Sequence, residues 1–182
     1  MTDAELIRDS LVNAAAFAVL FDRHYRAIHR FLHARIGRAL AEDIASETFT
    51  VAFRRRASYD LSHPNARPWL YGIAVNVLRD HRRTEQRRLS AYSRAAHTKE
   101  MQFDSEEAGL DPTVAAALLQ LSTSDRHLIL LYAWAQLSYE ELAEALSLPL
   151  GTVRSRLSRT RSKLRATLAS LDAAPLPTRD SA

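Results

Sequence analysis

The sequence predicts an all-α protein with two small helical domains joined by a flexible linker. Apolar residues recur at i, i+3, i+4 and i+7, the spacing of a helix face, along most of the 182 residues. No segment is a strong candidate for a β-strand. Residues 89–112 break the periodicity and are acidic, and helical patterns are complete on both sides of them. We therefore expect domains at 1–88 and 113–171, a linker at 89–112 and a disordered tail at 172–182.

The composition excludes several classes of protein. The chain has no cysteine, which excludes disulfides, thiolate metal sites and cysteine nucleophiles. No apolar run approaches the roughly 18–20 residues that span a bilayer. The N-terminal sequence MTDAELIRDS is too acidic and polar for a secretory signal. We expect a cytoplasmic protein without membrane insertion.

The charge distribution suggests contact with a polyanion. The net charge is only +4, but two basic blocks lie on either side of the acidic stretch. A protein that contacts a polyanion at two places has this pattern. Two ordinary solvated surfaces would have it too, so the charge alone does not decide.

The N-terminal domain is predicted to begin with a short helix at 3–12 and a long one after it. Asn13 can cap the start of the long helix, and Gly37 can end it. Apolar residues keep helical spacing over about five turns between these two positions. This long helix is the best-supported element of the domain.

Two more helices complete the predicted N-terminal domain. One covers residues 41–56, and the other begins at Pro68 and runs to residue 88, with a loop at 58–67 between them. Gly72 lies inside the last helix, where it costs roughly 1 kcal/mol of helix propensity. Such a glycine indicates either close packing against another segment or no particular role.

The second domain is predicted to contain a helix-turn-helix. Helices at 113–120 and 124–135 precede the segment LSYEELAEALSLPLGTVRSRLSRTRSKLR at 137–165. Ser138 and Glu141 have the spacing of a capping box. Ser147 occupies the turn, where glycine often supplies a left-handed residue, so a mild strain is expected.

The second helix of this pair has an apolar back and a front of hydroxyl groups and arginines, which suits the major groove of DNA. Arginine can bind guanine through two hydrogen bonds, and further basic residues can neutralise phosphates. Non-binding helical hairpins share the pattern, but DNA binding is favoured. The outward residues are Thr152, Ser155 and Arg159, with Lys163 on the same side and Arg154 and Arg156 flanking.

Asp43 and Glu47 are four residues apart and therefore share a helix face. Three interpretations remain open: a catalytic carboxylate pair, a solvated acidic face, and a docking face for a basic partner. No partner nucleophile is visible in the sequence. A solvated face is favoured over catalysis, and docking is the more specific alternative.

His29 and His33 have the i, i+4 spacing of metal ligands. No glutamate lies between them, as a zinc-protease helix requires, and no third ligand can be assigned. We expect neither a metal nor another cofactor.

Aromatic, amide and arginine residues gather around the helix that begins at Pro68. Such a set can stack on unpaired bases and hold a nucleic-acid backbone. Trp69 can equally be a core residue, so this evidence is weak by itself. The set is Trp69, Tyr71, Asn76, Arg79, Arg82 and Arg83.

Together these segments resemble a sigma-70-family RNA polymerase sigma factor of the small extracytoplasmic-function type. The resemblance covers residues 14–88, sigma region 2, and 113–168, sigma region 4. It is carried by AEDIASETFTVAFRR at 41–55, ARPWLYGIAVNVLRDHRR at 66–83 and the helix-turn-helix, in the family's order. No region 3 domain fits between them, which favours the short type.

The resemblance implies a promoter-specificity subunit with no catalysis of its own and no small-molecule substrate. Asp43 and Glu47 would bind core RNA polymerase, with Ser46 where the family often has glutamine. The helix from Gly151 would recognise the −35 element of promoter DNA, and an anti-sigma factor is a common partner. The expected −10 residues are Trp69, Asn76, Arg79, Asp80, Arg82 and Arg83.

The residues themselves leave two alternative functions open. A stand-alone helix-turn-helix regulator would use its N-terminal domain for sensing or dimerisation, but it has no need of the motif at 66–83. A small helical metal hydrolase would use His29 and His33.

Overall fold

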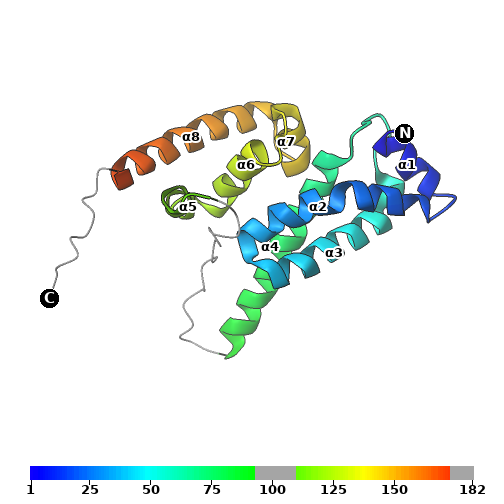
Figure 1. Ribbon diagram of the computed structural model, residues 1–182, viewed down its shortest axis with the longest axis horizontal. Helices are drawn as coiled ribbons and strands as arrows, with labels where there is room; N and C mark the ends of the chain where they lie inside the picture. Colours follow the sequence, from blue (N-terminus) through cyan, green and yellow to red (C-terminus); the bar gives the residue numbers. More distant parts are fainter. Residues whose placement is uncertain (93–109, 173–182) are drawn as a thin grey trace.

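The computed structural model describes residues 1–92 and 110–172, and every regular element in these ranges is helical (Figure 1), which confirms the all-α class. Residues 93–109 of the predicted linker and residues 173–182 of the predicted tail lie outside the described residues, and Asp172, predicted to begin the tail, is the last residue of a helix. In chain order the elements are α1 (Asp3–Ser10), α2 (Ala16–Ile36), α3 (Arg38–Arg55), the 3-10 turn η1 (Arg56–Ser58), α4 (Arg67–Tyr92), α5 (Pro112–Leu119), α6 (Thr123–Ala133), α7 (Tyr139–Leu146) and α8 (Leu150–Asp172).

The first group of helices packs around α2 and α3, which lie side by side, with α1 against α2 and α4 against α3 (Figure 1). The apolar stripes of the helices meet in one core, where each fully buried aliphatic side chain contributes roughly 1.5–3 kcal/mol of transfer free energy. Its most deeply buried aliphatic residues are Leu6, Ile7, Leu20, Ile28, Leu32, Ile44, Leu70 and Leu78.

Several helix boundaries differ from the prediction, and the three largest differences lie in α2, α3 and α4. The helix α2 begins at Ala16 because Asn13 caps the preceding turn, where its Oδ1 accepts from the Ala15 amide at 3.2 Å. Gly37 ends α2 as predicted, with φ of 75°, but α3 follows at once from Arg38 rather than from residue 41. The helix α4 continues to Tyr92 instead of ending at residue 88.

The second group, α5 to α8, contains the predicted helix-turn-helix as α7 and α8. The capping box is confirmed: the Glu141 amide donates to Ser138 Oγ at 3.1 Å, and the Ser138 amide donates to Glu141 Oε2 at 2.8 Å. Ser147 ends α7 with φ of 52° and ψ of 47°, so the expected left-handed serine is also confirmed. These local signals fix the angle between the two helices.

The two groups of helices pack on each other through α4 and α7 (Figure 1). Gly72 makes this possible, because a Cβ atom at that position would lie 2.6 Å from the Ala145 carbonyl oxygen. The close-packing interpretation of Gly72 is therefore confirmed, and its partner belongs to the other domain.

Polar contacts surround this close approach. Asn65 Nδ2 donates to Glu141 Oε1 at 3.1 Å, and the Arg67 guanidinium donates to the Ala135 carbonyl oxygen. His63 Nδ1 lies 3.5 Å from Glu144 Oε2. The residues just before α4 and at its start therefore hold the second domain in place.

Gly72→Ala should separate the two domains while leaving each of them folded. The added methyl group overpacks the contact at a cost of roughly 1–3 kcal/mol, whereas alanine favours α4 itself by about 1 kcal/mol. Small-angle X-ray scattering should show a larger radius of gyration with unchanged helix content. The control is Gly151→Ala, since a Cβ atom there meets nothing within 4 Å. Equal radii for both variants and the wild type would contradict the prediction.

Candidate nucleic-acid and protein interfaces

The helix α8 presents a basic, solvated face opposite a buried one. Val153, Leu157 and Thr160 are buried against the domain core. The residues predicted to contact DNA lie on the other side, with Thr152 half-buried and Arg154, Ser155, Arg159 and Lys163 exposed. This arrangement leaves a hydroxyl-and-arginine surface open to a groove of duplex DNA.

The arginines of this face differ in how firmly they are held. Arg156 Nη2 donates to Asp125 Oδ1 at 2.8 Å, and both side chains are mostly buried. Burial alone would raise the pKa of Asp125, but the hydrogen bonds from Arg156 and Ser122 lower it. Arg159 is held only by its own helix, through Nε to the Ser155 carbonyl oxygen at 3.3 Å. Arg156 therefore secures α8 to α6, and Arg159 keeps an exposed guanidinium.

The predicted −10 residues divide between the surface and the interior of α4. Trp69 is half-buried and packs on Tyr59, with ring centroids 5.0 Å apart. This packing agrees with the alternative in which Trp69 is a core residue. Arg82 is also half-buried, and its Nη2 is enclosed. The exposed members are Asn76, Arg79, Asp80 and Arg83.

The acidic residues of α3 lie on the surface. Asp43, Ser46 and Glu47 are all exposed, with Asp43 about one turn before the other two. The neighbouring Glu42 lies 3.7 Å from Arg38 in an ion pair. Because Asp43 and Glu47 face water, the structure offers no basis for the desolvated carboxylate that acid–base catalysis requires.

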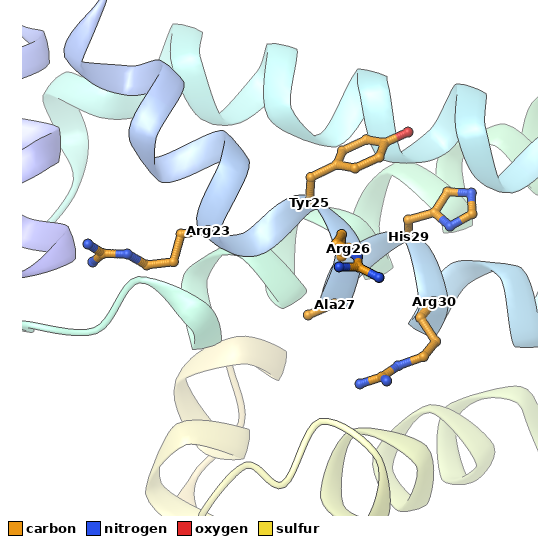
Figure 2. A pocket seen from close by; sticks show the side chains of 6 residues that line it. All are labelled: Arg23, Tyr25, Arg26, Ala27, His29 and Arg30. Carbon is orange, nitrogen blue, oxygen red and sulfur yellow. The ribbon is translucent and has the colours of Figure 1, made fainter.

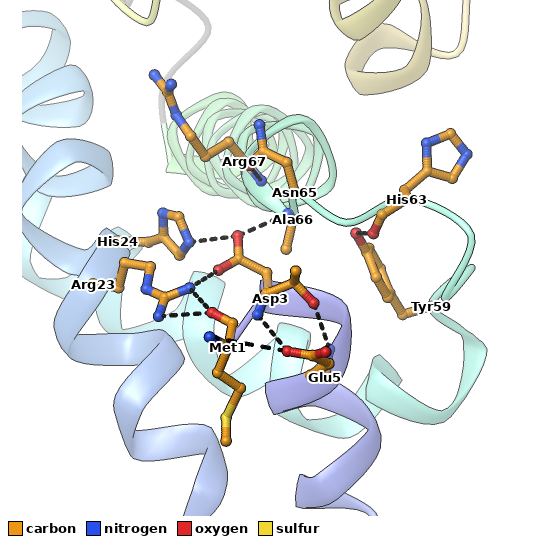
Figure 3. A network of polar contacts seen from close by, with 11 residues as sticks. Met1, Asp3, Glu5, Arg23, His24, Tyr59, His63, Asn65, Ala66 and Arg67 are labelled. Atoms are coloured by element: carbon orange, nitrogen blue, oxygen red, sulfur yellow. Dashed lines mark hydrogen bonds and ion pairs between the residues drawn. The ribbon is translucent and has the colours of Figure 1, made fainter.

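A buried network around Asp3 fixes the start of α4 (Figure 3). The Asp3 carboxylate accepts from Arg23 Nη1 at 2.7 Å, from His24 Nε2 at 2.8 Å and from the Ala66 amide at 2.9 Å. The Asp3 amide donates to the Pro64 carbonyl oxygen at 3.0 Å. The first helix is thereby tied to the residue that precedes α4, and sequence reasoning missed this because the partners are far apart in the chain.

Opposing effects set the acidity of Asp3. Burial would raise its pKa, but hydrogen bonds from His24, Ala66 and Arg23 and the attraction of His24 lower it to about 2. The carboxylate is therefore held in its charged form, with an exposed fraction of only 4%.

The histidines at positions 29 and 33 belong to a row of stacked rings along α2. Their ring centroids are 5.8 Å apart, and Tyr25 stacks on His29 at the same distance. Within residues 1–92 and 110–172 no three His, Cys, Asp or Glu residues form a group suited to a metal. Figure 2 shows Tyr25 and His29 projecting from one side of α2 and Arg30 from the other, around a surface hollow.

No helix in the described part of the chain is long and apolar enough to cross a membrane.

Comparison with known protein families accounts for both helical domains. The family described as Sigma-70 region 2 matches residues 20–88, and the family described as Sigma-70, region 4 matches residues 113–164. RNA polymerase sigma factor CarQ of Myxococcus xanthus is 35% identical over 164 residues, which cover 86% of this chain and 91% of CarQ. The chain belongs to the sigma-70 family.

Other relatives place this sigma factor in the extracytoplasmic-function group. RNA polymerase sigma factor NccH of Alcaligenes xylosoxydans xylosoxydans is 31% identical over 165 residues, which cover 85% of this chain and 88% of NccH. The ECF RNA polymerase sigma factor SigW of Bacillus subtilis is 29% identical over 170 residues, which cover 86% of this chain and 90% of SigW. The resemblance inferred from the sequence motifs is confirmed.

Two solved structures share the arrangement of the helices. The structure of CnrH in complex with the cytosolic domain of CnrY has a TM-score of 0.70 and 28% identity, and the match covers 92% of this chain and 97% of that one. The sigma factor RpoE from Bartonella quintana, in complex with the anti-sigma factor NepR, has a TM-score of 0.65 and 26% identity, with 84% and 96% covered.

Proposed function

We propose that this sigma factor binds core RNA polymerase and directs it to promoters by recognising a −10 and a −35 element, without catalysis of its own. The observation that supports the proposal is the set of three separate solvated faces on α3, α4 and α8, on which most of the residues assigned from the sequence are exposed. The protein acts in the cytoplasm, where polymerase and DNA are. An anti-sigma factor is its expected regulatory partner.

The acidic face on α3 is proposed to bind the polymerase. Asp43 and Glu47 have no ion-pair partner among the described residues, so their charges are available to a basic partner surface, and exposed Ser46 lies between them. Complementary charge favours fast and selective association.

The exposed side of α4 is proposed to bind the −10 element as single strands. Arg79 and Arg83 can contact phosphates, while Asn76 and Asp80 offer hydrogen bonds to base edges. Trp69 and Arg82 contribute from half-buried positions. The Asp3 network supports this face by fixing the residue before α4.

The exposed side of α8 is proposed to bind the −35 element as duplex DNA. Arg159, with Thr152 and Ser155, faces the base edges, while Arg154 and Lys163 contact phosphates. Arg156 is held by Asp125 and acts on the backbone from the rim.

Recognition of both elements requires the two domains to separate. The elements are about 25 base pairs apart by position, which is roughly 85 Å of duplex at 3.4 Å per step. A compact chain of 182 residues has a radius of gyration of about 16 Å. The α4–α7 packing therefore represents a form of the protein that cannot occupy both elements.

Run-off transcription with reconstituted holoenzyme tests the proposal. The sigma factor should direct core polymerase to start at a defined position on promoter DNA. A stand-alone regulator would bind duplex DNA tightly by itself and would not bind core polymerase. Tight independent binding together with no retention on immobilised core enzyme would reject the sigma mechanism for this chain.

The double substitution Asp43→Ala, Glu47→Ala should weaken core binding by roughly 2 kcal/mol, or about thirty-fold, because two charges of the docking face are lost. Fluorescence anisotropy of labelled sigma factor with core enzyme measures this. Glu42→Ala is the control, since Glu42 is an exposed carboxylate of the same helix that pairs with Arg38. Unchanged core affinity in the double variant would show that this face does not dock.

A further inference from the structure

Arginines and flat rings lie next to each other on the outer side of α2, and the proposed contacts on α3, α4 and α8 do not use them. Together they line a surface hollow of about 510 Å³ (Figure 2). In Figure 2 the rings project from one side of the helix and Arg30 from the other, with Arg26 between them. The lining residues are Arg23, Tyr25, Arg26, Ala27, His29 and Arg30.

Two of these arginines carry charges that no carboxylate neutralises. Arg26 and Arg30 are exposed and lie four residues apart, so they share a helix face. In the described part of the chain no ion pair or hydrogen bond engages either guanidinium, and Asp22 is the one carboxylate of α2. Arg23 differs, because its Nη1 donates to Asp3 Oδ1 at 2.7 Å. The hollow therefore presents two available cations.

A row of stacked rings forms the other edge of the hollow. Successive ring centroids are 4.7, 5.8 and 5.8 Å apart, and neighbouring planes lie within 26° of each other. In order the rings are Phe21, Tyr25, His29 and His33. Tyr25 also contacts Phe49 of α3 at 6.0 Å, which anchors the row against the core. His29 is half-exposed, so its ring reaches the surface beside the arginines.

This combination suits a single strand of nucleic acid. Unpaired bases stack on flat side chains, while arginines contact the phosphates between them. Duplex DNA keeps its bases paired and stacked on one another, so it would use the arginines and leave the rings without a role. An acidic protein segment would leave the rings without a role too.

The hollow also lies next to the helix proposed to bind the −10 element. Phe31, which follows Arg30, packs edge-on against Tyr71 of α4, with ring centroids 5.2 Å apart. Asn76, on the exposed side of α4, comes five residues after Tyr71, which is about 7.5 Å along a helix. A strand bound along α4 can therefore continue onto α2.

We propose that the hollow on α2 binds single-stranded DNA next to the −10 element, with Arg26 and Arg30 on phosphates and the His29 ring against a base. The inference deepens the proposed function and rests on it, since promoter opening supplies the single strand. It adds a second helix to the −10 contacts, because every −10 residue expected from the sequence lies on α4.

Fluorescence anisotropy of reconstituted holoenzyme with a single-stranded oligonucleotide that carries the −10 sequence tests the proposal. The double substitution Arg26→Gln, Arg30→Gln should lower the affinity roughly twentyfold at about 0.1 M salt. It should also reduce the slope of log affinity against log salt by about 1.4, because each neutralised phosphate of a single strand contributes about 0.7. The control is Arg54→Gln, Arg55→Gln, which removes two exposed arginines of α3 and should change neither quantity.

A second pair of variants tests the ring. His29→Ala should lower the oligonucleotide affinity at least fivefold, whereas His29→Phe should keep it, because stacking requires a flat ring and not an imidazole. Equal affinities of these two variants would overturn the proposal.

Core binding and run-off transcription distinguish failure of this inference from failure of the proposed function. If wild-type sigma factor binds core enzyme and starts at a defined position, while the Arg26 and Arg30 variant keeps its oligonucleotide affinity, only the inference about α2 is overturned. An equal loss on duplex DNA that carries the −35 element alone would indicate general charge attraction and would overturn it. A loss of core affinity in that variant would make this face a polymerase contact, and the proposal would be wrong.

Discussion

Asp3→Asn should destabilise the protein by about 3 kcal/mol at pH 7. The Asp3 carboxylate is buried and accepts hydrogen bonds from Arg23, His24 and the Ala66 amide. An amide of the same shape removes the charge and presents N–H groups to those donors, and breaking a buried charged network by removing one partner costs about 3–5 kcal/mol. Urea unfolding followed by circular dichroism measures the change. Asp9→Asn is the control, because Asp9 is an exposed carboxylate of the same short stretch that only pairs with Arg8.

The same carboxylate predicts how stability depends on pH. The folded-state pKa of Asp3 is about 2, against an ordinary value of 3.8. A lowered folded pKa means that its stabilisation is complete above about pH 4 and is lost as the pH falls through 2. The loss is about 2 kcal/mol. The difference in unfolding free energy between wild type and Asp3→Asn should therefore narrow by that amount from pH 5 to pH 2, and a constant difference would show that the charge is not responsible.

Arg159→Ala should weaken promoter binding by roughly 1–3 kcal/mol, which is about five- to 150-fold. The loss should depend on the identity of one base pair in the −35 element. The guanidinium is exposed and is held only by the Ser155 carbonyl oxygen. Its loss therefore removes a base contact and leaves the fold intact. Holoenzyme affinities for promoters substituted at each −35 position measure both the size and the place of the effect.

Arg165→Ala is the matched control for this prediction. Arg165 is also exposed on α8, and its Nε donates to the Arg161 carbonyl oxygen at 3.4 Å in the same way. Its removal should reduce affinity equally for all sequences or leave it unchanged. An equal loss across all promoters in Arg159→Ala would make Arg159 a phosphate contact and would refute base recognition.

Local signals allowed most helices to be predicted. The capping box at Ser138 and Glu141, the stop at Gly37 and the left-handed Ser147 act over four residues or fewer, so they are visible in the sequence. The errors arose at helix ends whose position depends on the conformation of neighbouring residues. Asn13 caps a turn instead of a helix, and α3 begins at Arg38 directly after Gly37. Three exposed faces were also predictable, since helical spacing separates a solvated side from an apolar one.

The contacts between distant segments could not be predicted. Asp3 with Ala66, Gly72 with Ala145 and Asp125 with Arg156 each join residues far apart in the chain. A sequence gives the chemistry of each member but not the partner. Trp69 shows the consequence: its type suits base stacking or a core, and only its packing on Tyr59 shows that its ring contributes to the interior.

The sequence by itself determined the all-α class, the helix-turn-helix, the family and the charged faces, because these depend on spacing and short motifs. The tertiary structure alone decided how α4 meets α7, why position 72 is glycine, and that Arg35 is enclosed. The physical reason is that burial and charge proximity are properties of the packed chain. A single residue acquires them only from neighbours that folding brings together.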